Sequence, residues 1–259
     1  MDKLTAQLAQ WQRGIAPELH FWDQWLATGG LSWPDDFRAR MDPATPLDPR
    51  IAELLRGLGR DRARLLDVGA GPVTSLGHQL PGMALEITAT DPLGALYAEL
   101  CARHGVAPPC PTGFAVAEDL ASFFPAGGFD LVHCRNALDH SFDPLRGIEQ
   151  MLAVTRTGGL VLLRHFPNEA ETEGYSGFHQ FNFDLREGRF LIWNREGVVD
   201  VAAALRCPCT VTPRQAEMLE VVIEKTGDSP ADPGEGAARL AAYLAAFVGV
   251  LGTPALPPH

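Results

Sequence analysis

The sequence lacks several features that mark other classes of protein. Its 259 residues carry a net charge of −11 without any run rich in lysine and arginine, which argues against binding to a phosphate backbone. The five cysteines lack C-x-x-C spacing and indicate neither a disulfide framework nor a zinc site. There is no signal-peptide pattern, and no apolar run is long enough for a bilayer. We expect a cytoplasmic protein that binds neither nucleic acid nor a membrane.

From Arg64 onward, strand and helix patterns alternate in the way that is typical of a parallel sheet with crossover helices. The chain length and the 46% hydrophobic composition suffice for one large domain with extensions. Short apolar runs bounded by turn residues predict strands at 64–68, 86–91, 113–116, 129–134, 159–165, 210–212 and 218–225. Helical spacing predicts helices at 73–80, 94–104 and 144–155.

The chain is expected to divide into three parts, namely a helical N-terminal extension (1–60), a core (61–226), and a C-terminal linker with a helix (227–259). Apolar residues at helical spacing over 3–28 predict two helices that separate near 14–17. Four prolines predict an irregular linker over 34–50, before a helix at 51–58. Alternating residues around a Glu-Gly turn predict a β-hairpin inserted at 178–195, serving as a lid or a partner surface.

The most informative segment is 65–77, which reads Leu-Leu-Asp-Val-Gly-Ala-Gly-Pro-Val-Thr-Ser-Leu-Gly. An apolar strand ends there in an acid and a two-glycine turn. Gly69 and Gly71 allow the backbone to turn tightly and to approach a ligand closely, and Pro72 suits the first turn of a helix. We therefore expect a ligand at this turn.

Two acids and one missing glycine narrow the choice of ligand. Thr74 occupies the third glycine position of the dinucleotide pattern G-x-G-x-x-G, and no Lys-Ser or Lys-Thr follows as in a P-loop. Asp67 would repel a pyrophosphate but attract a cationic ligand. Asp91 ends the second strand about twenty residues after the loop, where a carboxylate can accept both ribose hydroxyls. Because a nicotinamide enzyme would use the same acid, Asp91 indicates an adenosine ligand without deciding between the two classes.

The loop resembles the first motif, D-x-G-x-G, of the class I S-adenosylmethionine-dependent methyltransferases, and the resemblance covers roughly residues 62–167. It implies an α/β fold with a Rossmann-like, mostly parallel seven-stranded sheet and helices on both faces. Here that fold carries a helical N-terminal extension and an inserted β-hairpin. It also implies S-adenosylmethionine as the cofactor and S-adenosylhomocysteine as the product.

Later segments resemble further motifs of the family. Residues 116–120 match the adenine-binding stretch, although Val116 stands where the family often has an acid. Residues 129–140 and 158–165 are similar to the fourth motif and the fifth-strand region. The cofactor-binding residues implied in this way are Asp67, Gly69, Ala70, Gly71, Asp91, Pro92, Leu93, Glu118, Asp119, Leu120, Arg135 and Asn136.

Two histidines follow strands at the sheet edge where open α/β folds bind their ligands. His140 is the first candidate for a general base, and the alternative is that Asp139 and His140 brace the next helix, with Asp143 as its N-cap. His165 ends the fifth predicted strand and can form an acid–base pair with Glu169. The candidate catalytic residues are therefore His140, His165 and Glu169.

Asn168 and His179 are candidate substrate contacts, as is Trp22, although aromatic residues at helical spacing are also typical of core packing. The nitrogen and oxygen donors in these loops do not follow a recognised metal-ligand spacing. We therefore expect no metal. His133 is expected to be structural.

These patterns predict methyl transfer to a small polar molecule, with oxygen or nitrogen as the acceptor in preference to carbon. Two alternatives stay open. The first is a nicotinamide-dependent oxidoreductase on a similar sheet, and the second is a non-catalytic S-adenosylmethionine-binding partner protein. The sequence does not indicate the identity of the acceptor or the oligomeric state.

Overall fold

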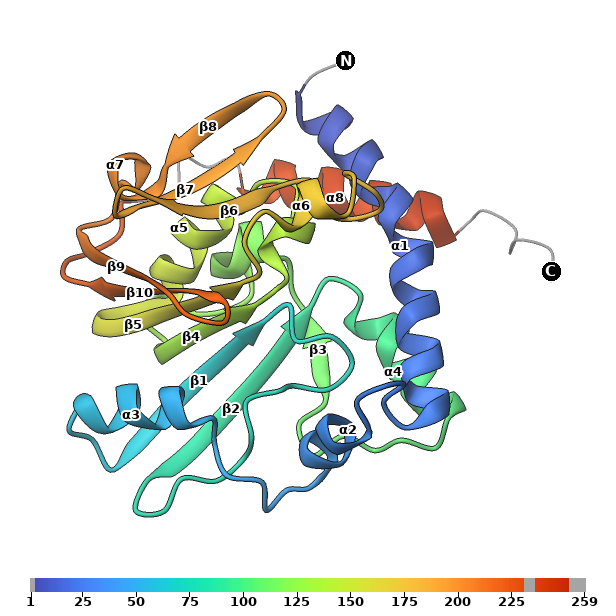
Figure 1. Ribbon diagram of the computed structural model, residues 1–259, viewed down its shortest axis with the longest axis horizontal. Coiled ribbons are helices and arrows are strands. Elements are labelled where there is room, and N and C mark those ends of the chain that lie inside the picture. The colour runs from blue at the N-terminus through green and yellow to red at the C-terminus, as the bar shows by residue number, and fades with distance from the viewer. Residues whose placement is uncertain (1–2, 231–235, 252–259) are drawn as a thin grey trace.

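The computed structural model of the chain describes residues 3–230 and 236–251. Its centre is a seven-stranded sheet with the order β3-β2-β1-β4-β5-β10-β9 (Figure 1). Strand β10 is antiparallel to both of its neighbours, whereas β1 to β5 pair in parallel. The strands are β1 (Arg62–Val68), β2 (Ala84–Asp91), β3 (Thr112–Phe114), β4 (Phe129–Arg135), β5 (Thr155–His165), β9 (Cys209–Gln215) and β10 (Leu219–Lys225). The predicted fold class is confirmed.

Helices cover both faces of the sheet because its central strands are apolar on both sides. On one face, Leu66 and Val132 pack with Met151 of α5 (Pro144–Val154). On the other face, Leu65 and Leu131 pack against α3 (Pro49–Gly57). This burial on both faces is the usual condition of a parallel strand with crossover helices.

The helix predicted at 73–80 does not form, and that prediction was wrong. Residues 70–83 make turns and isolated bridges, and their backbone donors and acceptors pair with the segment before α3. Gly77 has a φ of +79°, outside the helical region, and its backbone lies against Pro46. The Thr74 hydroxyl accepts from the Leu76 amide. Such local side-chain bonds compete with helix formation.

The N-terminal segment forms one continuous helix, α1 (Lys3–Thr28), with Pro17 inside it, so the predicted division near 14–17 was wrong. Leu8, Trp11 and Ile15 are buried in one cluster with residues of α4 (Gly94–Arg103) and α8 (Gly236–Leu251). This packing outweighs the ~3 kcal/mol cost of an interior proline.

The expected irregular linker contains the helix α2 (Pro34–Met41). Pro34 and Pro49 occupy the first turns of α2 and α3, where the missing amide hydrogen costs nothing. The helices predicted at 51–58, 94–104 and 144–155 correspond to α3, α4 and α5. The division into 1–60, 61–226 and 227–259 stays a prediction, and residues 231–235 and 252–259 of its last part lie outside the described residues.

The predicted hairpin forms as β6 (Asn182–Arg186) and β7 (Arg189–Asn194), and a third strand, β8 (Gly197–Asp200), joins it. Phe183 and Phe190 are buried in the same core cluster as β10. Short helices flank this small sheet, α6 (Glu169–Thr172) before it and α7 (Val201–Ala204) after it. Within the described chain, no helix combines the length and the apolar character needed to cross a bilayer.

Candidate active site

The glycine loop follows β1 at the carboxyl edge of the sheet. Gly69 and Gly71 have φ values of +70° and +63°, which strongly favour glycine. The amides of Gly69 and Ala70 donate to the Thr90 carbonyl of β2. This pairing holds the loop against the end of the neighbouring strand.

Asp67 is buried beneath the loop and has two partners within the protein. Its Oδ1 lies 2.8 Å from Nδ1 of His133, and its Oδ2 accepts from the Thr74 hydroxyl at 2.5 Å. The sequence pattern indicates neither partner, because in it Thr74 only replaces the third glycine and His133 lies within a strand with no partner nearby in the chain. The two contacts fix the orientation of the Asp67 carboxylate.

Asp91 ties the end of β2 to the glycine loop. Its carboxylate accepts from the amides of Gly71 at 3.2 Å and Leu93 at 2.9 Å. Burial raises the pKa of Asp91 to about 7, and the negative charge of Glu18 adds to the effect. Leu93 is buried, and the carbonyl of the half-buried Pro92 accepts from the Tyr243 hydroxyl.

The acids expected near the adenine are engaged inside the protein. Glu118 accepts from the amides of Phe142 and Asp143, and burial raises its pKa to about 8. Asp119 pairs with Arg146 at 2.9 Å. Both acids are buried, as is Leu120. These contacts bind the 3-10 helix η1 (Ala117–Ser122) to the start of α5, which Asp143 caps by accepting from the Arg146 amide.

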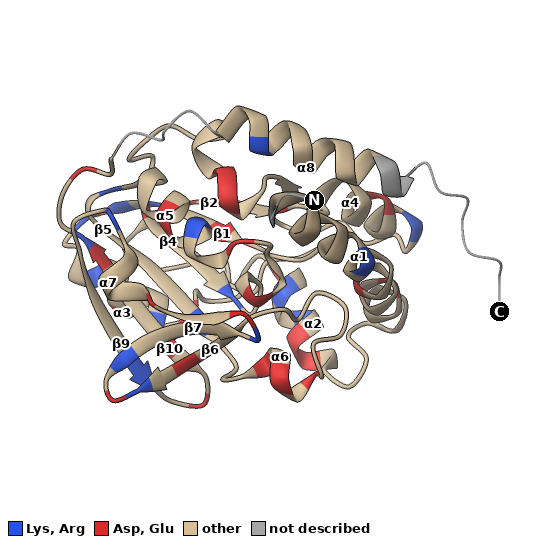
Figure 2. Cartoon of the chain, turned by 90° about the horizontal axis from the view of Figure 1, so that it is seen from above, with Lys and Arg blue, Asp and Glu red and all other residues tan. Residues whose placement is uncertain are grey.

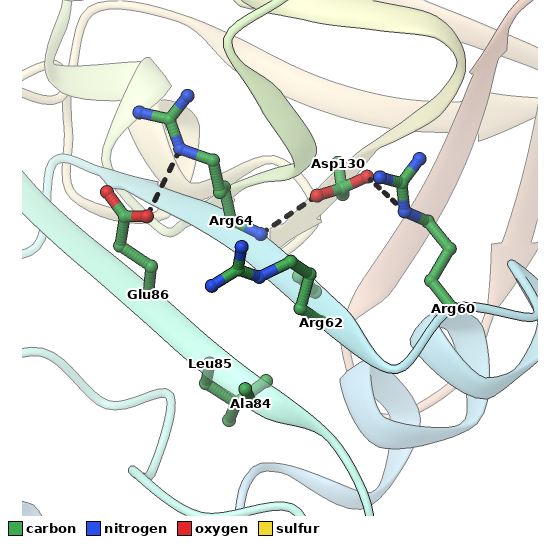
Figure 3. A pocket seen from close by; sticks show the side chains of 8 residues that line it. Arg60, Arg62, Arg64, Ala84, Leu85, Glu86 and Asp130 are labelled. Atoms are coloured by element: carbon green, nitrogen blue, oxygen red, sulfur yellow. Dashed lines mark hydrogen bonds and ion pairs between the residues drawn. The ribbon is translucent and has the colours of Figure 1, made fainter.

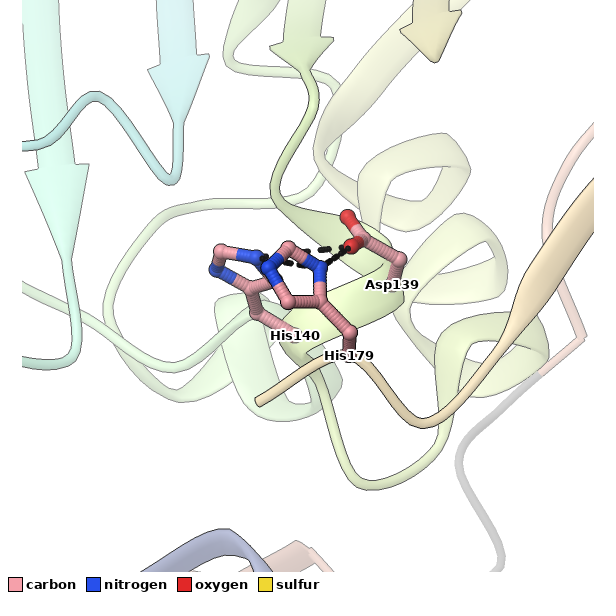
Figure 4. A group of neighbouring side chains, drawn as sticks. All are labelled: Asp139, His140 and His179. Carbon is pink, nitrogen blue, oxygen red and sulfur yellow. Dashed lines mark hydrogen bonds and ion pairs between the residues drawn. The ribbon is translucent and has the colours of Figure 1, made fainter. Parts of the chain in front are cut away.

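Asp139, His140 and His179 converge in a group that we call the His–Asp cluster (Figure 4). The first two belong to the 3-10 helix η2 (Leu138–His140), and His179 precedes β6. Oδ2 of Asp139 lies 2.9 Å from Nδ1 of His179 and 3.4 Å from Nε2 of His140. The two facing histidine nitrogens are 3.2 Å apart.

Opposite charges dominate the electrostatics of the cluster. Burial alone would raise the pKa of Asp139, but His140 and His179 hold it below its usual value. Burial would likewise lower the pKa of His179, but its hydrogen bond to Asp139 raises it. The lowered pKa of Asp139 and the raised pKa of His179 are consistent with each other, since each shift favours the charged form of its group.

Glu169 and His165 lie beside the cluster without a bond to each other. Glu169 accepts from the Asn136 side chain at 3.2 Å through Oε1, while its Oε2 is buried without a hydrogen-bond partner among the described residues. Burial, followed by the charge of Asp139, raises the pKa of Glu169. His165 stacks on Phe183, with ring centroids 4.2 Å apart. Neither of its ring nitrogens has a partner among those same residues, so the expected His165–Glu169 pair is not formed.

The other predicted site residues have different surroundings. Asn168 accepts from the Trp193 indole at 2.9 Å and so faces the inserted sheet. Asn136 has a φ of +48° and accepts from the Phe166 amide. Arg135 is exposed at the end of β4. These residues border the same sheet edge, but the hydrogen bonds of Asn168 do not join it to the His–Asp cluster.

One turn of α1 connects the glycine loop with the His–Asp cluster. The Trp22 ring lies against Gly71, and its indole donates to Oε1 of Glu18 at 2.7 Å. Oε2 of Glu18 is 4.0 Å from Nδ1 of His140. Glu18 was missed from the sequence, although its i,i+4 spacing to Trp22 is a signal for a pair on one helix face.

A pocket also lies at the opposite edge of the sheet, where β1 and β2 begin (Figure 3). Its arginines include Arg64, which pairs with Glu86, and Arg60, which pairs with Asp130. The ligand edge of a parallel sheet is the carboxyl edge, so this pocket is not the candidate active site.

Residues 66–163 match the family described as "Methyltransferase domain". This segment of the chain is therefore a methyltransferase domain. Its cofactor is S-adenosylmethionine, and the nicotinamide alternative is set aside. The glycine loop fits this cofactor in its chemistry, because its positive-φ turn places the backbone amide of Gly71 beside the Asp91 carboxylate.

Solved structures similar to the methyltransferase domain include three that are described as methyltransferases. The CurJ carbon methyltransferase is 19% identical, with a TM-score of 0.49 over 68% of this chain and 52% of its own. A methyltransferase from Methanosarcina mazei is 18% identical, with a TM-score of 0.42 over 71% of this chain and 100% of its own. A third structure, from Methanococcus maripaludis, is 15% identical, with a TM-score of 0.44 over 71% of this chain and 87% of its own. The chain thus spans about half the length of the CurJ carbon methyltransferase chain, and no curated protein matches it.

Proposed function

We propose that this methyltransferase transfers the methyl group to an oxygen or nitrogen atom of a small polar molecule. The observation that carries the proposal is the link through α1. Trp22 lies on the glycine loop, and Glu18, one helical turn away, reaches the His–Asp cluster. A turn of helix rises only about 5.4 Å. The cofactor loop and the polar cluster therefore border one site.

The chain's own residues supply orientation and charge. S-adenosylmethionine, when bound, supplies a methyl group that its sulfonium makes electrophilic. Gly69 and Gly71 provide the positive-φ turn of the loop, and Asp91 can accept the ribose hydroxyls. Positioning of this kind contributes up to ~7–11 kcal/mol to a displacement. We therefore assign most of the rate enhancement to the loop and the cluster holding their two ligands in line.

A candidate general base at this site favours an oxygen or nitrogen atom as the acceptor of the methyl group. A hydroxyl or a protonated amine must lose a proton to become nucleophilic, and a general base contributes ~10²–10⁴-fold. Oε2 of Glu169 is a buried carboxylate oxygen without a hydrogen-bond partner among the described residues, and the pKa of Glu169 is raised. Its neighbours in the cluster are polar and charged. We propose Glu169 as the proton acceptor and the cluster as the acceptor-binding group.

The charge distribution favours a small acceptor over a nucleic acid. In Figure 2, acidic and basic residues are scattered over several helices and strands. Several arginines are already paired with carboxylates, among them Arg50, Arg156, Arg164 and Arg206. Paired cations contribute less to binding of a phosphate backbone, which depends on counterion release by free ones.

The test measures cofactor binding and transfer separately. Calorimetry with S-adenosylmethionine, S-adenosylhomocysteine and NAD should show binding of the first two only. The protein is then incubated with S-adenosylmethionine and pools of small hydroxyl compounds, amines, carbon acids and short RNA, followed by mass spectrometry of methylated products. We expect methylated alcohols, phenols or amines. Methylation confined to carbon acids or to RNA would overturn the proposed acceptor class.

A further inference from the structure

We infer that Asp139, His140 and His179 bind a divalent transition-metal ion. The coordination positions of this ion that the protein leaves open bind the oxygen atom that accepts the methyl group. The role of the ion rests on the proposed function, whereas the site itself rests on the geometry of the cluster. The ligand class is a first-row ion of the zinc or iron(II) kind, because two imidazoles and one carboxylate suit these ions better than magnesium or calcium.

Hydrogen bonding alone does not satisfy the three contacts of the cluster. In a neutral imidazole, each ring nitrogen carries either a hydrogen or a lone pair. If both facing nitrogens carry hydrogens, both can donate to Oδ2 of Asp139, but the 3.2 Å contact between the nitrogens is then not a hydrogen bond. If one of them carries a lone pair, that lone pair faces Oδ2 of Asp139, at 3.4 Å for His140 or 2.9 Å for His179. No arrangement makes all three contacts hydrogen bonds at once, whereas a cation attracts all three lone pairs.

The spacing of the three atoms also suits an ion. Their mutual separations of 2.9, 3.2 and 3.4 Å form a nearly equilateral triangle. Ligands about 2.0–2.2 Å from a tetrahedral zinc ion lie roughly 3.3–3.6 Å from one another, slightly further apart than these atoms. An ion above this triangle is therefore within bonding distance of all three atoms without a large side-chain movement, and its remaining positions are left open.

The polar atoms around the cluster provide a second, independent observation. Oδ1 of Asp139, both ring nitrogens of His165 and Oε2 of Glu169 are buried without hydrogen-bond partners among the described residues. Buried polar atoms are almost always paired, so such a group of exceptions indicates an ion or bound water. Glu18 adds an outer carboxylate, 4.0 Å from Nδ1 of His140. A metal-bound histidine commonly directs its second nitrogen at a carboxylate.

This inference departs from the expectation of no metal, which rested on ligand spacing. Asp139 and His140 are adjacent, but His179 follows His140 by 39 residues and belongs to the segment before the inserted sheet. No short motif joins them. The third ligand reaches the site only because the chain returns there, where the Gln180 amide donates to the Asp139 carbonyl.

The ion would act on the acceptor rather than on the cofactor. A metal-bound hydroxyl is more acidic than a free one. Its proton passes to the Glu169 carboxylate, and the oxygen forms a bond to the methyl carbon. The bond between that carbon and sulfur breaks, with its electron pair staying on sulfur. The products are a methyl ether, S-adenosylhomocysteine and one proton, so no oxidant or reductant is required.

The experiment measures metal binding directly. Protein without an affinity tag is stripped with a chelator and titrated with ZnCl2 in competition with a chromophoric chelator, and separately with CoCl2 while visible absorption is recorded. We expect one zinc per chain and a cobalt absorption band typical of nitrogen and oxygen ligands. His179→Ala and His140→Gln should each weaken zinc binding by more than ~100-fold, beyond the effect of losing an outer partner.

A matched control is His104→Ala. His104 also pairs with a carboxylate, Asp23, at 2.8 Å, and the described residues provide no third ligand for that pair. This variant should bind zinc like the parent. Circular dichroism and binding of S-adenosylmethionine show that the His179 and His140 variants are folded. The inference is overturned if the parent binds less than one zinc at saturation, or if folded variants bind zinc like the parent.

Failure of the metal site and failure of the proposed function give different results. If zinc does not bind while chelator-treated protein still methylates a hydroxyl or an amine, the metal inference is wrong and the function stands. If zinc binds with the expected loss in the two variants but no acceptor of these classes is methylated, the site stands and the proposed acceptor class fails.

Discussion

The indole ring of Trp22 lies over Gly71, so close that a Cβ atom on this glycine would be 2.8 Å from Cζ2 of the ring. The contact brings α1 onto the glycine loop. Gly71 cannot be replaced easily for two independent reasons. A larger residue would collide with Trp22, and the φ of +63° is unfavourable for residues other than glycine. Both the conformation of the glycine loop and its packing against α1 therefore depend on Gly71.

Gly71→Val should abolish detectable binding of S-adenosylmethionine. The added side chain collides with Trp22 and strains the backbone. The matched control is Gly197→Val, because Gly197 is exposed in β8 and a Cβ there meets nothing within 4 Å. Calorimetry on both variants checks this prediction, with thermal unfolding to show that they are folded. Parent-like binding by a folded Gly71→Val protein would mean that the loop does not hold the cofactor.

The affinity for S-adenosylmethionine should depend on pH through Asp91. Burial raises the pKa of Asp91 to about 7, and only its ionised form accepts two hydroxyls. The affinity should therefore fall about tenfold for each pH unit below this pKa and level off above it. The groups that face Asp91 are Glu18 of α1, His140 after β4, Tyr97 of α4 and Tyr243 of α8.

Asp91→Asn is the control for the pH dependence. Asparagine retains one acceptor but does not titrate, so binding should be weaker than in the parent and nearly constant from about pH 6 to pH 8. Calorimetry across this range measures both proteins. The same slope in the two proteins would assign the titration to another group.

Glu169→Gln should lower turnover by ~10²–10⁴-fold while leaving cofactor affinity within a few-fold of the parent. Glutamine keeps an oxygen for the Asn136 side chain but cannot take up the acceptor's proton. Glu171→Gln, on the exposed side of the same short helix, is the control. Steady-state kinetics with the identified acceptor decides the matter, and unchanged turnover in Glu169→Gln would exclude this residue as the base.

His165 should make the fold sensitive to acid. Burial lowers its pKa to about 4 from an ordinary value of 6.5, so the unfolded chain binds the extra proton between these values. The His165 contribution to stability is complete above pH 6.5 and decreases as the pH falls towards 4. Over this range the free energy of unfolding falls by about 3 kcal/mol because of His165. His165→Phe keeps the stack on Phe183 and should remove this share of the pH dependence.

Urea unfolding of His165→Phe and the parent at about pH 7 and about pH 4.5 measures the difference. The exposed His20 provides a control variant, His20→Ala, which should keep the parent's pH dependence. An identical loss of stability in His165→Phe and the parent would show that the acid sensitivity arises from other groups.

Local patterns in the sequence were sufficient for the sheet and for the glycine loop. Strand positions follow from short apolar runs, because a strand buried on both faces requires them. The turn at Gly69 and Gly71 requires residues that tolerate positive φ, and Asp91 follows at the spacing of the second strand. These features depend on residues close together in the chain, so the sequence by itself determined them.

Long-range contacts decided the rest. Pro17 stays within α1 because apolar packing with α4 and α8 outweighs its local cost, and residues 70–83 bond to another segment instead of forming a helix. The His–Asp cluster joins the end of β4 with the segment before β6, and Glu18 approaches it from α1. Such contacts depend on how distant elements pack, and no local pattern contains that information. The sequence therefore determined the glycine loop and the acid that follows it, and only the tertiary structure decided which side chains meet in the His–Asp cluster.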